Sequence, residues 1–175
     1  MTISMYTMSV DSFVPMLESL AGILDKAATH ASRQNTDPVR ARLAPDMYDL
    51  AQQVQMACHY ATDTAARLQG KPARAPAADN DDQSIDDLKR RIAIAIQELK
   101  AVARDSLSGS EGCNCNLPIP NGMMIEMDGL RFLRSWSLPH FYFHVVTAYD
   151  ILRHNGVTIG KRDYLSQVGQ FISPQ

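Results

Sequence analysis

Residues 138–165 read LPHFYFHVVTAYDILRHNGVTIGKRDYL and carry the clearest helical pattern in the chain. Apolar side chains recur there every three or four positions, at Phe141, Val145, Ala148, Ile151 and Leu152. This spacing predicts a helix with one apolar face. Because proline suits the first turn of a helix and glycine often follows the last, we expect the helix to span residues 139–155 and to stop at Gly156.

Three further segments with the same periodicity lie upstream. The first is expected from Ser9 to Ala31, and the second from Pro45 or Asp46 to about Leu68. The third is expected to begin after an N-cap at Ser84 and to end before Ser108. Polar or proline-rich stretches separate these segments, including a surface connection over residues 70–82.

The segment between the third and fourth helices contains turn-forming pairs rather than helical periodicity. Asn121-Gly122 and Asp128-Gly129 predict an extended excursion or a short hairpin around Met123 to Met127. The tail from Thr158 to Ile172 is expected to lie against the helices. Four amphipathic helices bury their apolar faces most simply as an all-α four-helix bundle, which we predict as one domain over residues 1–175.

Composition excludes several classes of function. With 45% hydrophobic residues, a net charge of -2 and dispersed basic residues, the chain offers neither a nucleic-acid-binding surface nor a membrane-spanning segment. The first ten residues do not resemble a signal peptide. Three cysteines, Cys58, Cys113 and Cys115, are too few and too irregular for a secreted disulfide framework. We therefore expect a cytoplasmic protein.

Two histidines in the fourth helix have the spacing of metal ligands. His140 and His144 are four residues apart, so they project from the same helix face, as a single ion would require. His140 is also expected in the first turn, where the positive end of the helix dipole favours neutral imidazole. Aromatic side chains at the start of this helix could form the floor of a pocket beside His144, although such residues are more often ordinary core and interface residues; they are Trp136, Phe141, Tyr142 and Phe143.

The chain resembles a bacterial and fungal family of unknown function within the DinB/YfiT-like superfamily of metalloenzymes. The resemblance is carried by residues 138–165 and extends to PDMYDLAQQVQMACHYATDTAARLQG, residues 45–70, and IDDLKRRIAIAIQEL, residues 85–99. It implies an up-down-down-up bundle that forms a homodimer. Many superfamily members bind a divalent metal through one histidine on the second helix and two on the fourth, which correspond here to His59, His140 and His144.

The residues leave two functional hypotheses open. Three neutral imidazoles would suit zinc, nickel or iron, and a thiol transferase-like or hydrolytic enzyme. His59, however, lies roughly 150° from the centre of the apolar stripe on its helix, which favours unrelated histidines. The other hypothesis is a homodimeric module that binds a small molecule or a protein. No phosphate-binding loop, catalytic carboxylate pair or HExxH motif is present.

The cysteine pair at Cys113 and Cys115 adds a separate, weaker signal. Two thiols this close could capture a soft metal ion or react with an oxidant. A CxC sequence without further ligands also fits two reduced loop thiols with no dedicated role. Cys58 falls on the apolar stripe of the second helix, and we interpret it as a small core residue.

Overall fold

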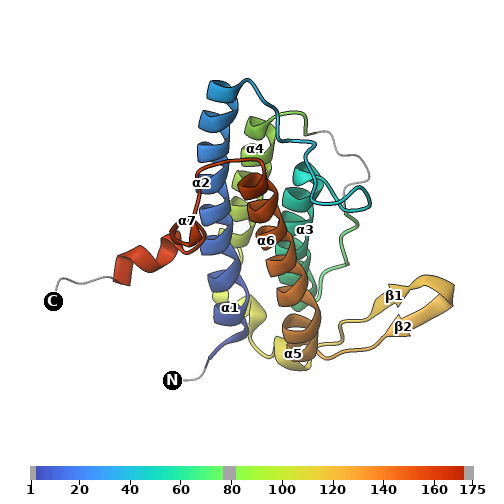
Figure 1. The fold of residues 1–175 in the computed structure, drawn as a ribbon. Helices are drawn as coiled ribbons and strands as arrows, with labels where there is room; N and C mark the ends of the chain where they lie inside the picture. Colours follow the sequence, from blue (N-terminus) through green and yellow to red (C-terminus); the bar gives the residue numbers. More distant parts are fainter. Residues whose placement is uncertain (1–2, 77–81, 172–175) are drawn as a thin grey trace.

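Four long helices lie side by side in the computed structural model, which describes residues 3–76 and 82–171 (Figure 1). They are α2 (Val10–Gln34), α3 (Leu50–Leu68), α4 (Ile85–Lys100) and α6 (Leu138–His154). α3 packs against both α6 and α4, and α2 packs against α4 and α6. The predicted, mainly helical architecture is confirmed.

The first and third of these helices begin where the sequence indicated. α2 follows the short helix α1 (Met5–Met8) and ends at Gln34, before the cap residue Asn35, which adopts a left-handed conformation with φ 52°. At α4, the Ser84 hydroxyl accepts a hydrogen bond of 3.1 Å from the Asp87 amide, as expected of an N-cap. α4 ends at Lys100, and the 3-10 turns η1 (Arg104–Leu107) and η2 (Ser110–Gly112) follow it.

The predicted start of the second helix was wrong by about one turn. α3 begins at Leu50 rather than at Pro45 or Asp46, because Asp49 and Gln52 form a capping box. The Asp49 carboxylate accepts from the Gln52 amide at 2.9 Å, and the Gln52 side chain accepts from the Asp49 amide at 3.1 Å. This reciprocal pair satisfies two amides that the start of the helix would otherwise leave without partners.

The predicted hairpin is confirmed and begins slightly earlier than expected. β1 (Leu117–Ile119) pairs antiparallel with β2 (Met123–Ile125) across the turn η3 (Pro120–Gly122). Pairing continues beyond the strands at the end of the hairpin away from its turn. There Asn114 forms a bridge to Asp128, and the Cys115 amide donates to the Met127 carbonyl at 2.8 Å. The hairpin projects away from the helices at one end of the molecule (Figure 1).

The fourth long helix does not start at Pro139. Helical backbone begins at α5 (Gly129–Phe132), passes through one π-helical segment, η4 (Leu133–Ser137), and continues directly into α6. The wider hydrogen-bond spacing of a π segment accommodates a residue without an amide hydrogen, so Pro139 lies inside the helical run. The end was predicted correctly, since Gly156 follows the helix with φ 83°.

The tail contacts α2, as predicted. It contains α7 (Lys161–Tyr164) and η5 (Ser166–Phe171). Asp163 forms an ion pair of 2.6 Å with Lys26, and the Ser19 and Ser166 hydroxyls lie 2.7 Å apart. Ile172, at the predicted end of this tail, and residues 77–81 of the predicted connection lie outside the described residues.

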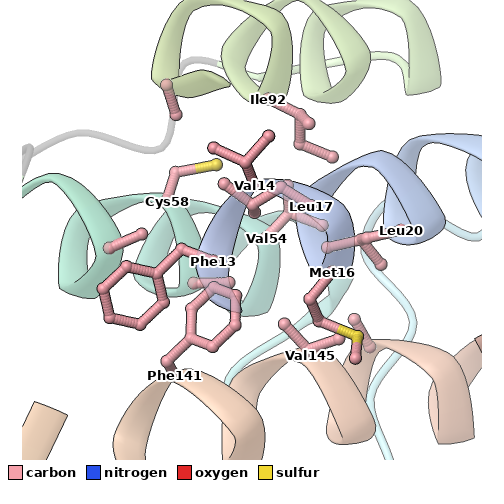
Figure 2. Packing of buried hydrophobic residues seen from close by; sticks show 14 of the residues in the cluster. Phe13, Val14, Met16, Leu17, Leu20, Val54, Cys58, Ile92, Phe141 and Val145 are labelled. Atoms are coloured by element: carbon pink, nitrogen blue, oxygen red, sulfur yellow. The ribbon is translucent and has the colours of Figure 1, made fainter. Parts of the chain in front are cut away.

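The hydrophobic core lies where the four long helices meet (Figure 2). Phe13 of α2 and Phe141 of α6 are fully buried, with an edge-on ring contact of 4.8 Å between centroids. Cys58 lies on α3 in this core, which confirms its interpretation as a small core residue. Within the described residues, no helix is both long and apolar enough to cross a bilayer.

Candidate functional site

A second stripe on α3, different from its apolar stripe, faces α6 and positions the candidate site. Gln53, Tyr60 and Thr64 are spaced so that they lie along one side of the helix. Each contacts the helical run that ends in α6. Gln53 is hydrogen-bonded to His144, Tyr60 contacts two imidazoles, and Thr64 shares a hydrogen bond with the Ser137 hydroxyl. The α3–α6 interface is therefore polar along part of its length.

The rings at this interface form a continuous cluster. Tyr60 stacks on His140 with centroids 4.6 Å apart and on His144 with centroids 5.5 Å apart. Trp136 contacts His140 at 4.4 Å, and Tyr48 stacks on His144 at 6.3 Å. We call these five side chains the imidazole–aromatic cluster. Tyr48 is 47% exposed, whereas His144 is only 6% exposed, so the cluster extends from the surface into the interface.

Hydrogen bonds assign the proton on each imidazole. His140 Nδ1 lies 2.7 Å from the Trp136 carbonyl oxygen, which can only accept, so Nδ1 must donate. His144 Nδ1 lies 2.7 Å from Gln53 Oε1. The orientation of the Gln53 amide follows from its Nε2 atom, which donates to the Tyr48 carbonyl at 3.2 Å. The Oε1 atom therefore faces His144 and accepts from its Nδ1–H. In its neutral form, each imidazole therefore carries its proton on Nδ1 and keeps a lone pair on Nε2.

Burial keeps His144 neutral. It lowers the pKa of His144 to about 4, and the nearby imidazoles of His140 and His59 contribute to the same direction. Burial likewise lowers the pKa of His59 and raises that of the Tyr60 phenol. We predicted that His140 lies in the first turn of its helix, where the helix dipole would favour neutral imidazole. This prediction was wrong, because helical backbone already begins at Gly129. At neutral pH, His144 consequently presents a hydrogen-bond acceptor rather than a positive charge.

The three predicted metal ligands are placed in two different surroundings. His140 and His144 lie at the α3–α6 interface, whereas His59 lines a depression between α3 and α4 together with Arg74, Arg91 and other residues. All three imidazoles contact Tyr60, His59 through an edge-on contact of 5.4 Å. Across residues 3–76 and 82–171, no three His, Cys, Asp or Glu side chains are arranged to hold a metal ion. The three-histidine site stays a prediction.

Sequence reasoning missed Gln53 and Tyr60. Gln53 is only 1% exposed and bridges α3 to α6, although glutamine is usually a surface residue. A signal was present in the spacing. Gln53, Ala57, Tyr60 and Thr64 recur at helical intervals beside the apolar stripe, which is typical of a helix with two buried faces.

Replacing Gln53 with leucine is expected to reduce the free energy of unfolding by about 2 kcal/mol. Leucine has a similar volume but leaves the His144 Nδ1–H and the Tyr48 carbonyl without their partner. Urea denaturation measures the loss. Gln97→Leu, the same change on the exposed surface of α4, should stay within about 0.5 kcal/mol of the unmodified protein. Equal effects of the two changes would contradict a bridging role for Gln53.

Comparison with known proteins places the chain in a family. A model of the family described as domain of unknown function DUF1993 matches residues 5–165. The chain belongs to the DUF1993 family. This DUF1993 chain is also similar to a solved structure, a DinB family member protein from Shewanella denitrificans, with 35% identity and a TM-score of 0.81. The match covers 91% of this chain and 90% of the other. No curated protein matches.

Proposed function

We propose that this DUF1993 protein is a homodimeric binding module that takes up a small molecule at the imidazole–aromatic cluster. The observation that carries the proposal is the pair of imidazoles whose Nδ1 protons are already committed to protein acceptors. Their Nε2 lone pairs remain as acceptors between aromatic rings. Such a surface suits an uncharged, flat ligand that carries a hydrogen-bond donor, as a phenol does.

The homodimer is part of the same proposal and is supported by the outer face of α6. Phe143 is 57% exposed and Val146 is 39% exposed, one helical turn apart. Tyr48, on the neighbouring segment, adds to the exposed apolar surface beside His144. Helices that are apolar on all sides are normally covered, and a second copy would cover this face. Phe143→Asp should then convert a dimer into a monomer in analytical ultracentrifugation.

Three further expectations belong to this proposal. They are the up-down-down-up order of the helices, a single domain over residues 1–175, and a cytoplasmic location. The last agrees with the three cysteines, all of which are free thiols.

Ligand uptake can be measured through the single tryptophan. Trp136 contacts His140, so a ligand in the cluster should change its fluorescence. We expect a saturable change on titration with phenol, with excitation at wavelengths that phenol does not absorb and an affinity of about millimolar. His144→Phe removes one acceptor and should abolish saturation. His154→Gln alters an exposed histidine at the end of α6 and should leave the titration unchanged.

A metal-dependent enzyme remains the second candidate because of one specific observation. Metal-binding histidines usually donate their other ring N–H to a carbonyl or carboxylate, and His140 and His144 both donate Nδ1–H to carbonyl oxygens. A divalent zinc, nickel or iron ion held by their Nε2 atoms would supply Lewis acidity to a bound water or thiol. These two residues fit such an ion, and His59 is the predicted third ligand.

Elemental analysis of the tag-free protein separates the two candidates. Near-stoichiometric zinc, nickel or iron that His144→Ala removes would establish the metal-dependent protein and overturn the metal-free binding module. A saturable phenol titration in protein without metal would support the binding module instead. A titration that His144→Phe leaves intact would contradict the assignment of the ligand to this cluster.

A further inference from the structure

Cys113 and Cys115 present their thiols on the same side of an extended segment. The backbone at Cys113 is extended, with φ -66° and ψ 153°, and Asn114 forms a bridge to Asp128 across the base of the hairpin. In extended backbone, residues two apart face the same side. The two sulfur atoms accordingly lie 3.5 Å apart, and both residues are free thiols.

The two thiols differ in how a reagent can approach them. Cys113 is half-buried and lines an open depression of about 250 Å³ together with Gly112, Asn114, Glu126, Met127 and Asp128. Cys115 is only 2% exposed and packs in the hydrophobic core. An incoming molecule therefore meets the Cys113 sulfur first and reaches Cys115 only through it.

We propose that Cys113 and Cys115 are a reversible redox site that exchanges with low-molecular-weight disulfides of no net charge. The Cys113 sulfur attacks one sulfur of the small disulfide, forms a mixed disulfide and releases one small thiol. The Cys115 sulfur then attacks the Cys113 sulfur, closes the intramolecular disulfide and releases the second small thiol. The two protein thiols lose their protons to the two released thiols, and the small disulfide takes up the two electrons.

The surroundings assign the order of attack and the charge of the reagent. Burial, followed by the neighbouring Cys113, raises the pKa of the Cys115 thiol to about 12, so Cys115 is not the first thiol to attack. The carboxylates of Glu126 and Asp128 line the depression at Cys113, and an ion pair of 3.4 Å with Arg131 partly neutralises Asp128. They repel anionic disulfides at short range and leave uncharged ones unaffected.

The geometry also makes the resulting bond easy to reduce. The two sulfur atoms must move about 1.5 Å closer to reach the length of a disulfide bond. Side chains two residues apart in extended backbone also lie farther apart than disulfide geometry prefers. The backbone must therefore adjust at the hydrogen bond between the Cys115 amide and the Met127 carbonyl. Strained disulfides are the labile ones, so ordinary thiols should restore the reduced pair.

The test exposes the full-length protein to 2-hydroxyethyl disulfide and then titrates its thiols after denaturation. Two of the three thiols should be lost, with a mass decrease of two hydrogen atoms and no change in oligomeric state. Dithiothreitol should restore all three. Cys115→Ser should stop at a mixed disulfide on Cys113, whereas Cys113→Ser should remain unmodified. Cys58→Ser is the matched control, because its thiol is in the core and its loss should leave the oxidation unchanged.

The charge of the reagent gives a second measurement. Each disulfide is also reacted with free 2-mercaptoethanol, and its rate with the protein is divided by this reference rate to correct for intrinsic reactivity. After this correction, oxidised glutathione, which is anionic, should react with the protein more slowly than 2-hydroxyethyl disulfide. Added salt should reduce this difference. Retention of all three thiols, disulfides between chains, or a pair that stays reduced and captures Cu(I) would each overturn the proposal. Equal modification of Cys113→Ser and Cys115→Ser would overturn the assigned order.

Discussion

Lowering the pH from about 7 to about 4 is expected to remove about 3 kcal/mol of stability through His144 alone. The pKa of an unfolded histidine is 6.5, and burial lowers that of His144 in the folded protein to about 4. Above 6.5 the imidazole is neutral in both states and imposes no penalty. As the pH falls from 6.5 towards 4, the unfolded chain binds a proton that the folded chain does not, so the free energy of unfolding decreases.

Urea denaturation at several pH values between about 7 and 4 measures this effect, and variants isolate it from carboxylates that titrate in the same range. His144→Gln removes the titrating group and should flatten the dependence of stability on pH. His154→Gln changes an exposed histidine on the same helix and should leave the dependence as it is. If His144→Gln and the unmodified protein lose equal stability on acidification, His144 is not the buried, neutral group described above.

Replacing Gly129 with alanine is expected to destabilise the fold by about 3 kcal/mol, the upper end of the usual cost of overpacking. A Cβ atom on Gly129 would lie 2.0 Å from the Ser110 carbonyl oxygen and 2.9 Å from Cys113 Sγ. Because the nearer atom belongs to the backbone and Ser110 is buried, the clash cannot be relieved by a rotamer change. The turn η2 and the Cys113 side chain would have to move away from the start of α5.

Gly22→Ala provides the matched control. Gly22 lies inside α2, where an added Cβ would meet nothing within 4 Å. Alanine is the better helix former, so this change should raise the free energy of unfolding by roughly 0.5–1 kcal/mol. Thermal or urea denaturation of the two variants should thus give effects of opposite sign. A neutral Gly129→Ala would show that the contact between α5 and Ser110 is looser than described.

The four long helices could be predicted from sequence because each has a periodic apolar stripe, but the starting points of α3 and α6 could not. At α3, the proline and acid at Pro45 and Asp46 resemble a helix start, whereas the capping box at Asp49 and Gln52 provides the actual one. At α6, Pro139 again suggested a beginning. A π segment there lets the helical backbone run through a proline, and apolar periodicity does not reveal such a segment.

The candidate site was predicted only in part for a similar reason. The i, i+4 spacing correctly placed His140 and His144 on one face. What lies opposite them depends on the rotation of α3, which brings Gln53 and Tyr60 to that interface and turns His59 towards α4 as well. One-dimensional spacing gives the faces of a helix, but tertiary packing decides which face meets which neighbour.

The hairpin offers a practical route to study this protein. It projects to one side of the helices (Figure 1), and its turn η3 contains Asn121 and Gly122. Exposed turns of this kind tolerate inserted peptides. A short biotin-acceptor sequence placed between these two residues would tether the molecule to a sensor chip by that end, with the opposite surfaces left accessible to analytes in flow.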